Sequence, residues 1–519
     1  MTAAAASPAS AEVRRPARWL RLLLFAVVAG VALAWAYLFW AALNSVPMLA
    51  GDHAFFTPVV QQMRLTGELT QPWVLHMAGT KFNWHSWLYP TLASLLPFTD
   101  DYYRIGAGLL LPVVSLTLLF AWFVLRPRLT LTGILLIPVM FAVALYQSPR
   151  FELLSSHFVC LAIPLLFRSE APSFKGHAAL AVLVALTALA QPTVGFYASV
   201  ALAMALLLWS RSLAQFLALA AGYAAAVLAI VVLATELHPQ LSFAEWLGAL
   251  LTQARVLSGR SDGSFIFYNI TEPGLFLKLV YLLSLPLLGL ALWREAGGER
   301  SLPWKRPLLA ALFLLAAVVV WFTSIRLPGT VYNLVGLAPI ILYALHLLAN
   351  RSWPGRPLAL ALLAAALVGS SASIAYRAAF AWQSVEGVSA ASFRTAIAPL
   401  GSARSEIGAP SQLIPYVAQV LPQARLVTWP RAEFVETEEV RRLANRPPPI
   451  LIVVQADSGW QAPPEQPGYR LALDRFHRSP PAVAGMTIGR TRKDFAFAVY
   501  CRPEACAELA ELGRQAEPR

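Results

Sequence analysis

The chain has 519 residues, enough for roughly three or four average domains, but its composition excludes a set of soluble ones. Hydrophobic residues make up 58% of the chain and charged residues only 13%, about half the charged share of an ordinary globular protein. A mean hydropathy of +0.60, with 11% aromatic residues, also excludes a disordered chain. The composition therefore predicts a multi-pass membrane protein.

The 40 Lys and Arg residues outnumber the 27 Asp and Glu residues and give a net charge of +13. In a membrane protein such an excess gathers in the cytoplasmic loops and sets the orientation, so we predict no nucleic-acid partner. Three cysteines are too few for a disulfide framework. Cys160 lies in an apolar run and is expected in the core. Cys501 and Cys506 are close enough in sequence either to pair in an oxidising compartment or to stay as thiols.

The N-terminal residues 1–18 form an Ala- and Ser-rich tail. The apolar run that follows, 19–43, is too long for the core of a signal peptide and lacks a convincing cleavage site. It predicts a first transmembrane helix that starts in the cytoplasm. Further apolar runs of nearly the length that a crossing helix needs are predicted as spans: 104–125, 130–148, 152–167, 177–191, 193–210, 213–235, 274–292, 307–325, 331–349 and 357–376.

The Lys and Arg residues of the predicted loops agree with this topology. Fourteen lie in or before the short loops assigned to the inside: Arg14, Arg15, Arg18, Arg126, Arg128, Arg168, Lys175, Arg211, Arg294, Arg300, Lys305, Arg306, Arg351 and Arg356. The longer outer loops before residue 377 hold six: Arg64, Lys81, Arg150, Arg255, Arg260 and Arg326. The roughly fivefold difference in density follows the positive-inside rule and predicts that 377–519 lies outside the cytoplasm.

Two of the predicted outer loops, 44–103 and 236–273, are long. In the first, apolar residues recur at helical spacing over 55–63 and 84–96, segments too short to cross a membrane. Both are predicted as helices that lie in the outer interface, and so is 241–257 in the second loop.

The composition changes at about residue 377, where charges return and apolar runs shorten. Segments typical of strands alternate with segments of helical periodicity, which predicts a small α/β domain over 377–519. The predicted strands are 424–429, 449–454, 469–474 and 495–500, and the predicted helices are 389–400, 411–421 and 437–446. The expected fold is thus an all-α polytopic membrane domain over 19–376, with about eleven spans, followed by an extracytoplasmic α/β domain.

Asp52 follows the first predicted span by about eight residues and opens the first interfacial helix. It is either the N-cap of that helix, accepting backbone N–H bonds, or a carboxylate that takes a proton from a substrate hydroxyl. The two roles are compatible, because a capping side chain is held in a fixed direction.

A span followed by an acidic residue at the start of an aromatic amphipathic helix resembles the beginning of a GT-C membrane glycosyltransferase. This group includes protein O-mannosyltransferases and lipid A aminoarabinose transferases. The likeness covers most of 19–350 and rests on the order of four motifs: the acidic position in Gly51–Phe56, the apolar Trp87–Leu96 before the second span, Pro149–Glu152 at the start of a later span, and Arg326–Tyr332 with Pro339 in a late helix.

The resemblance implies transfer of a sugar, with inversion, from a polyprenyl-phosphate carrier to a hydroxyl of a lipid, glycan or protein acceptor. It also implies that Asp52 is the catalytic base. Many relatives have two adjacent acids at this point, whereas here His53 follows Asp52. A divalent metal would need that second acid, so a metal is not supported, although it is not excluded, and no other cofactor is predicted.

The departing phosphate of the carrier needs cations at headgroup depth. Lys278 and Arg326, at the outer ends of two predicted spans, either bind this phosphate or only extend to the interface. Arg150 and Glu152 either form an ion pair at a helix start or line the sugar pocket. The predicted substrate and carrier site is completed by His53, Lys81, His85 and Tyr332. For Lys81 and His85, which flank an interfacial helix, exposed loop positions are the alternative.

Two other functions are alternatives to this interpretation. A polymerase or ligase of polyprenyl-linked glycans usually depends on a long late outer loop, whereas here the long loop comes first and begins with an acid. A transporter would show Gly- or Pro-broken spans, or mid-membrane charges, in matching halves of the chain, and the sequence shows no such pairing. The Ala-, Leu- and Arg-rich composition is typical of bacteria, so we predict a bacterial inner-membrane protein with membrane lipids among its partners.

Overall fold

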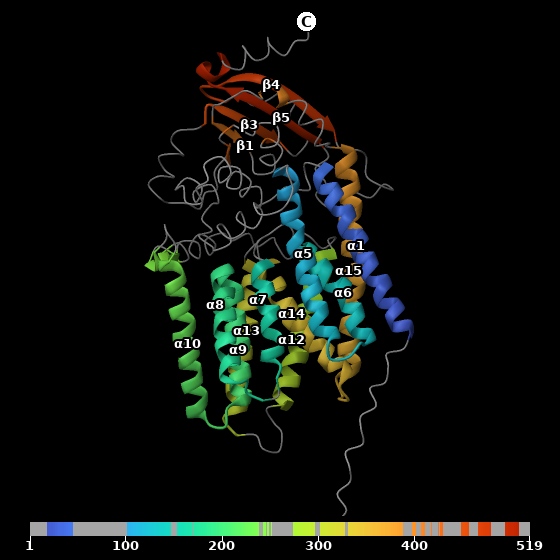
Figure 1. Cartoon of the computed structure of the whole chain (residues 1–519), viewed down its shortest axis with the longest axis vertical. Coiled ribbons are helices and arrows are strands. Elements are labelled where there is room, and N and C mark those ends of the chain that lie inside the picture. The colour runs from blue at the N-terminus through green and yellow to red at the C-terminus, as the bar shows by residue number, and fades with distance from the viewer. Residues whose placement is uncertain are drawn as a thin grey trace, which may run out of the picture.

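The structure is a computed structural model. It describes residues 18–44, 101–146, 153–168, 170–237, 242–244, 246–248, 251, 273–295, 302–326, 331–387, 397–400, 406–409, 417, 424, 426–428, 448–455, 466–478 and 494–507. Within these ranges the chain forms a bundle of long helices and, beyond one end of the bundle, a small sheet (Figure 1).

Each apolar run predicted as a span forms a helix. The long helices are α1 (Arg18–Asn44), α5 (Asp101–Leu125), α6 (Leu131–Tyr146), α7 (Leu153–Leu166), α8 (Phe174–Ala190), α9 (Pro192–Trp209), α10 (Leu213–Glu236), α12 (Pro273–Glu295), α13 (Lys305–Arg326), α14 (Val331–Asn350) and α15 (Arg356–Gly387). In the described part of the chain, four segments are long and apolar enough to cross a membrane: Arg18–Ala41, Pro192–Trp209, Leu213–Glu236 and Arg356–Ala379.

Local sequence signals set several helix boundaries. Pro192 ends the run of α8 because a residue before proline avoids the helical conformation, and Gln191 is accordingly extended, with φ −153° and ψ 105°. Pro192 itself starts α9, where its missing N–H costs nothing. Ser212 caps α10: its Oγ accepts the N–H of Gln215 at 3.1 Å. The single-residue connection folds α9 back against α8.

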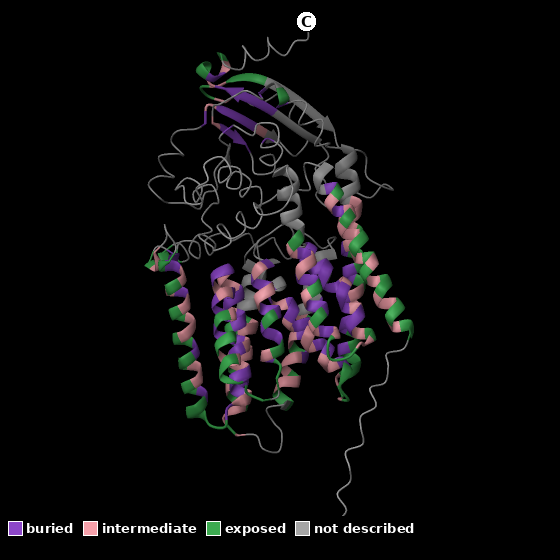
Figure 2. Cartoon of the chain, in the orientation of Figure 1, coloured by how far each residue is buried: buried purple, intermediate pink, exposed green. Residues whose placement is uncertain are grey.

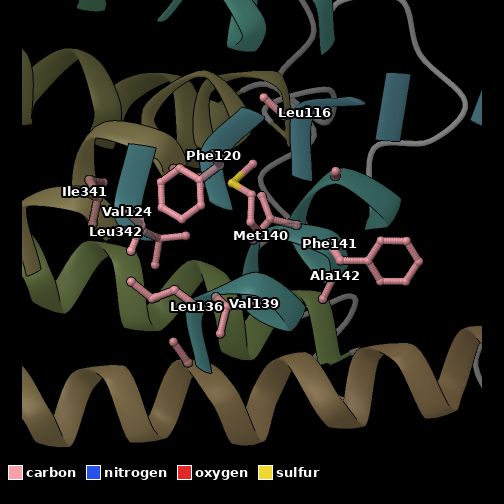
Figure 3. Packing of buried hydrophobic residues seen from close by; sticks show 14 of the residues in the cluster. Leu116, Phe120, Val124, Leu136, Val139, Met140, Phe141, Ala142, Ile341 and Leu342 are labelled. Atoms are coloured by element: carbon pink, nitrogen blue, oxygen red, sulfur yellow. The ribbon is translucent and has the colours of Figure 1, made fainter. Parts of the chain in front are cut away.

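The main core lies where α5, α6, α14 and α15 pack together. Phe120 of α5, Met140 of α6 and Leu342 of α14 are fully buried in it (Figure 3). A second cluster joins α7, α8, α9 and α10. Lipid is as apolar as these side chains, so close packing, rather than escape from water, holds such helices together.

Exposed residues follow the outer sides of the helices (Figure 2), and many of them are large and apolar. Phe25 and Leu33 of α1 are 74% and 72% exposed, and Leu233 of α10 and Leu314 of α13 are 60% and 63% exposed. Many exposed large apolar side chains on one bundle are typical of a surface that contacts a membrane. The described helices are therefore compatible with an integral, multi-pass membrane protein.

The sheet has the strand order β2-β1-β3-β5-β4. Its strands are β1 (Ile407–Ala409), β2 (Leu426–Thr428), β3 (Ile450–Gln455), β4 (Arg470–Arg478) and β5 (Asp494–Cys501). β1 runs parallel to β2 and β3, whereas β5 is antiparallel to β3 and β4. Four strands fall where the sequence predicted them, and β1 was not predicted.

The predicted helices of the C-terminal region lie almost entirely outside the described residues. Ala398–Leu400, at the end of the predicted 389–400, forms a short 3₁₀ turn. Only residue 417 is described within 411–421, and none within 437–446. α15 continues past 376, where the sequence analysis ended the membrane domain, to Gly387.

The contact between α9 and α14 depends on a glycine. A Cβ added at Gly336 would collide with the side chain of the buried Val194. We expect Gly336→Ala to destabilise the fold by about 1–3 kcal/mol, the usual cost of overpacking, and Val194→Ala in the same chain to restore much of it. Thermal unfolding of the purified protein in detergent measures both effects. Gly222→Ala on α10 is the matched control, because a Cβ there meets nothing within 4 Å. Equal melting temperatures for the two glycine variants would contradict this packing.

Candidate functional site

Three of the predicted site residues lie on neighbouring helices at the sheet end of the bundle. Lys278 is in the second turn of α12, Arg326 is the last residue of α13, and Tyr332 is the second residue of α14. These three helices pack against one another and alternate in direction, so that α12 and α14 begin, and α13 ends, on the side of the sheet (Figure 1). The backbone thus brings positions that are far apart in sequence to one end of the bundle.

The other predicted substrate-site residues lie outside the described residues: Asp52, His53, Lys81, His85, Arg150 and Glu152. The last two directly precede α7, which begins at Leu153 and packs against α14.

A half-buried polar pair, Ser115 and His157, joins α5 to α7 one turn after the start of α7. The His157 Nδ1 lies 2.8 Å from the Leu153 carbonyl oxygen, so the N–H on this nitrogen donates to the carbonyl. The other ring nitrogen, Nε2, lies within hydrogen-bond distance of the Ser115 Oγ, at 2.7 Å, and the same hydroxyl lies 3.2 Å from the Pro112 carbonyl oxygen. These two contacts hold the imidazole ring in one orientation.

Ser156, next to this pair, is fully buried, and its Oγ has no hydrogen-bond partner among the residues that the structure describes. Sequence reasoning singled out neither Ser115 nor Ser156. A serine within an apolar run is common at packed helix interfaces, so the pattern offered no signal of a special role. Ser115 and His157 are 42 residues apart, and only the packing of α5 on α7 makes them neighbours.

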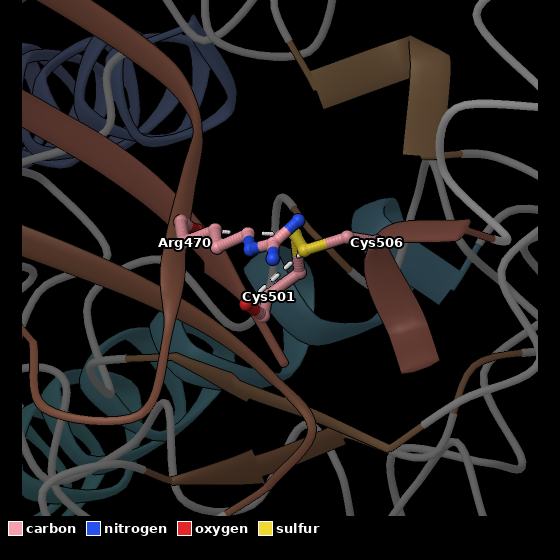
Figure 4. The surroundings of a disulfide bond; sticks show 3 residues. All are labelled: Arg470, Cys501 and Cys506. Atoms are coloured by element: carbon pink, nitrogen blue, oxygen red, sulfur yellow. Dashed lines mark hydrogen bonds between the residues drawn. A yellow bond between two sulfur atoms is a disulfide. The ribbon is translucent and has the colours of Figure 1, made fainter. Parts of the chain in front are cut away.

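Cys501 and Cys506 are joined by a disulfide, with a Cα–Cα distance of 5.2 Å (Figure 4). Cys501 ends β5, and Cys506 lies in the helical turn 503–507 that follows it. The bond ties this turn to the sheet beside β4, where the Cys501 Sγ lies 3.8 Å from the carbonyl oxygen of Arg470. Disulfides persist in oxidising compartments and are rare in the cytosol.

The charges of the bundle are distributed unequally between its two ends. At the end away from the sheet, the described connections and helix ends carry Arg126, Arg128, Arg168, Lys175, Arg211, Arg294, Lys305, Arg306, Arg351 and Arg356. Glu170 and Glu295 are the acidic residues described there. An excess of basic residues at one end of a membrane bundle is the pattern that the positive-inside rule describes.

Nothing among the described residues forms a ready metal site: no three His, Cys, Asp or Glu side chains come together there. Comparisons with protein-family models and with curated proteins found no match for the chain.

Proposed function

We propose that the chain is a GT-C-type glycosyltransferase of the bacterial inner membrane, with eleven spans, the tail 1–18 in the cytoplasm and the segment 377–519 on the outer side. It transfers a sugar from a polyprenyl-phosphate carrier to a hydroxyl of a lipid, glycan or protein acceptor. One observation carries the proposal: the candidate carrier-binding positions Lys278, Arg326 and Tyr332 share the end of the bundle that adjoins the disulfide-bonded sheet.

The eleven-span topology is supported by the arrangement of the helices. Among the described residues, the other seven long helices pack in one bundle with the four that contain segments long and apolar enough to cross a membrane. The connections within the bundle alternate between its two ends (Figure 1). An odd number of spans puts the two chain ends on opposite sides, which agrees with an oxidised C-terminal domain and a basic opposite end.

The chemistry assigns one role to each group. The Asp52 carboxylate takes the proton of the acceptor hydroxyl as its oxygen attacks the anomeric carbon of the sugar. The bond from that carbon to the phosphate oxygen breaks on the opposite face, so the configuration inverts and polyprenyl phosphate leaves. Lys278 and Arg326 stabilise the charge that gathers on the departing phosphate.

The proposal is tested with the full-length protein in nanodiscs, supplied with polyprenyl-phosphate sugars labelled in the sugar. Release of free polyprenyl phosphate, together with transfer of label to an added bacterial envelope lipid or glycan fraction, is the expected result. A polymerase or ligase would instead consume polyprenyl-diphosphate-linked glycans. A transporter would move a substrate across a vesicle membrane without breaking a bond. Either of those results, without cleavage of a monophosphate-linked sugar, would overturn the proposal.

The proposed location of 377–519 on the outer side of the membrane can be tested separately. A reporter that is active only in the periplasm, fused after Arg519, should be active, and one that fluoresces only in the cytoplasm should be dark. Cys501 and Cys506 should resist alkylation in the native membrane until a reductant is added. A cytoplasmically active fusion, or two freely alkylated thiols, would contradict the odd number of spans.

A further inference from the structure

Two connections at the bundle end away from the sheet form a cluster of positive charge. The first, 126–130, joins α5 to α6 and carries Arg126 and Arg128. The second, 351–356, leads from α14 into α15 and carries Arg351 and Arg356. All four arginines are exposed, and neither connection contains an acidic residue. We call these two connections the arginine loops.

Hydrogen bonds between side chains hold the arginine loops next to each other. Asn350, the last residue of α14, donates from Nδ2 to the Oγ1 of Thr132 in the first turn of α6, at 2.9 Å. The same Thr132 oxygen lies 3.1 Å from the Nδ1 of the buried His346. The end of α14 and the start of α6 are thus fixed together, and the loops that they carry have one relative position.

The second loop is also fixed from within. Trp353 donates from Nε1 to the Leu348 carbonyl at 2.9 Å, and Arg356 donates from Nε to the Ala349 carbonyl at 3.1 Å. Both carbonyls lie in the last turn of α14, where the helix leaves such groups without partners. A Cβ on Gly355 would collide with the indole of Trp353, so the ring folds tightly over the loop. The Arg356 guanidinium is therefore held before any ligand arrives.

Apolar side chains are exposed just inside the arginine loops. The Arg126 guanidinium lies 5.9 Å from the ring centre of Trp122, which is 61% exposed one turn earlier on α5. Leu131 at the start of α6 and Leu358 at the start of α15 are 44% and 52% exposed. A fixed group of cations thus borders an apolar surface, which is the complement of a ligand with an anionic head and a hydrocarbon tail.

We infer that the arginine loops bind the phosphate headgroup of an anionic phospholipid from the leaflet that this end of the bundle faces. Guanidinium groups grip phosphate oxygens through paired hydrogen bonds, and basic pockets beside membrane helices recognise such headgroups. The acyl chains would lie along Trp122 and Leu358. This inference does not depend on the proposed glycosyltransferase activity, because the site lies at the opposite end of the bundle from the candidate carrier-binding positions.

The test is a titration of the purified full-length protein in neutral detergent with phosphatidylglycerol, followed by native mass spectrometry of the bound lipid. The double variant Arg126→Gln/Arg128→Gln should bind phosphatidylglycerol roughly 10- to 30-fold more weakly, since each basic residue at a membrane surface contributes about 1 kcal/mol. The matched control Arg168→Gln/Arg211→Gln also removes two exposed arginines from the same end of the bundle, and it should bind like the unmodified protein.

Four outcomes would overturn the inference. They are equal losses in the two double variants, unchanged binding in the Arg126/Arg128 variant, phosphatidylcholine binding as tight as that of phosphatidylglycerol, and displacement of the lipid by inorganic phosphate at equal concentration. The last result would identify a site for free phosphate. If the Arg126→Gln/Arg128→Gln variant does not fold, the affinity of the unmodified protein for phosphatidylglycerol is measured at increasing salt concentration. Binding through several arginines should weaken steeply as salt rises. An affinity that does not change with salt would show binding through the acyl chains alone and would also overturn the inference.

Discussion

An Asp52→Asn protein should bind the polyprenyl-phosphate sugar normally and turn it over about 100- to 10,000-fold more slowly, the contribution of a positioned general base. Asparagine keeps the size of aspartate and caps a helix about as well, but it cannot take a proton from the acceptor hydroxyl. The substitution therefore separates catalysis from capping. The rate of polyprenyl-phosphate release under single-turnover conditions measures the first, and the thermal midpoint of unfolding measures the second.

Asp101→Asn is the matched control for this experiment. Asp101 is another aspartate at a helix start, the first residue of α5, at the sheet end of the bundle. Its replacement should leave the rate of sugar transfer unchanged. Turnover of the Asp52→Asn protein at the unmodified rate would remove Asp52 from the mechanism, and with it the main residue-level support for a glycosyltransferase.

The substitutions Lys278→Met and Arg326→Gln replace each charge with a neutral side chain of similar length. Each should weaken binding of the donor by roughly 10- to 100-fold. A hydrogen bond to a charged group contributes about 1.5–3 kcal/mol, and each variant loses one such contact with the carrier phosphate. The dissociation constant of the intact donor, measured by displacement of a fluorescent analogue, is the readout. If the two side chains act on the carrier, expression and melting temperature should stay nearly normal.

Arg294→Gln provides the control for this pair. Arg294 lies in the last turn of α12, at the end opposite the turn that holds Lys278, and its removal should not change donor affinity. If the Lys278 and Arg326 variants bind the donor like the Arg294 variant, both side chains serve only as anchors at the membrane interface.

The helices of this protein could be predicted because their signal is local. Runs such as 213–235 and 331–349 are apolar over nearly their whole length, and the helices Leu213–Glu236 and Val331–Asn350 follow them closely. Polar or proline residues at the boundaries, such as Ser212 and Pro192, also act within one turn of the helix that they start. A strand of three residues carries too little pattern to detect, which explains why Ile407–Ala409 was not predicted.

The candidate site could be predicted only as a set of positions. Hydropathy placed Lys278, Arg326 and Tyr332 near span ends, but it contains no information on which spans are neighbours. The packing of α12, α13 and α14 supplies that information. The hydrogen bond between Ser115 and His157 depends in the same way on a contact between separate helices.

The sequence by itself thus determined the class of the protein, the extent of its helices and the asymmetry of its charges, because each depends on composition or on short-range periodicity. Only the tertiary structure decided that Cys501 and Cys506 pair, that Val194 leaves no room for a side chain at Gly336, and that Thr132 and Asn350 join two arginine-bearing loops. The physical reason is that these contacts need atoms within a few ångströms of one another. Spacing along the chain permits such approaches, and the packing of whole elements selects among them.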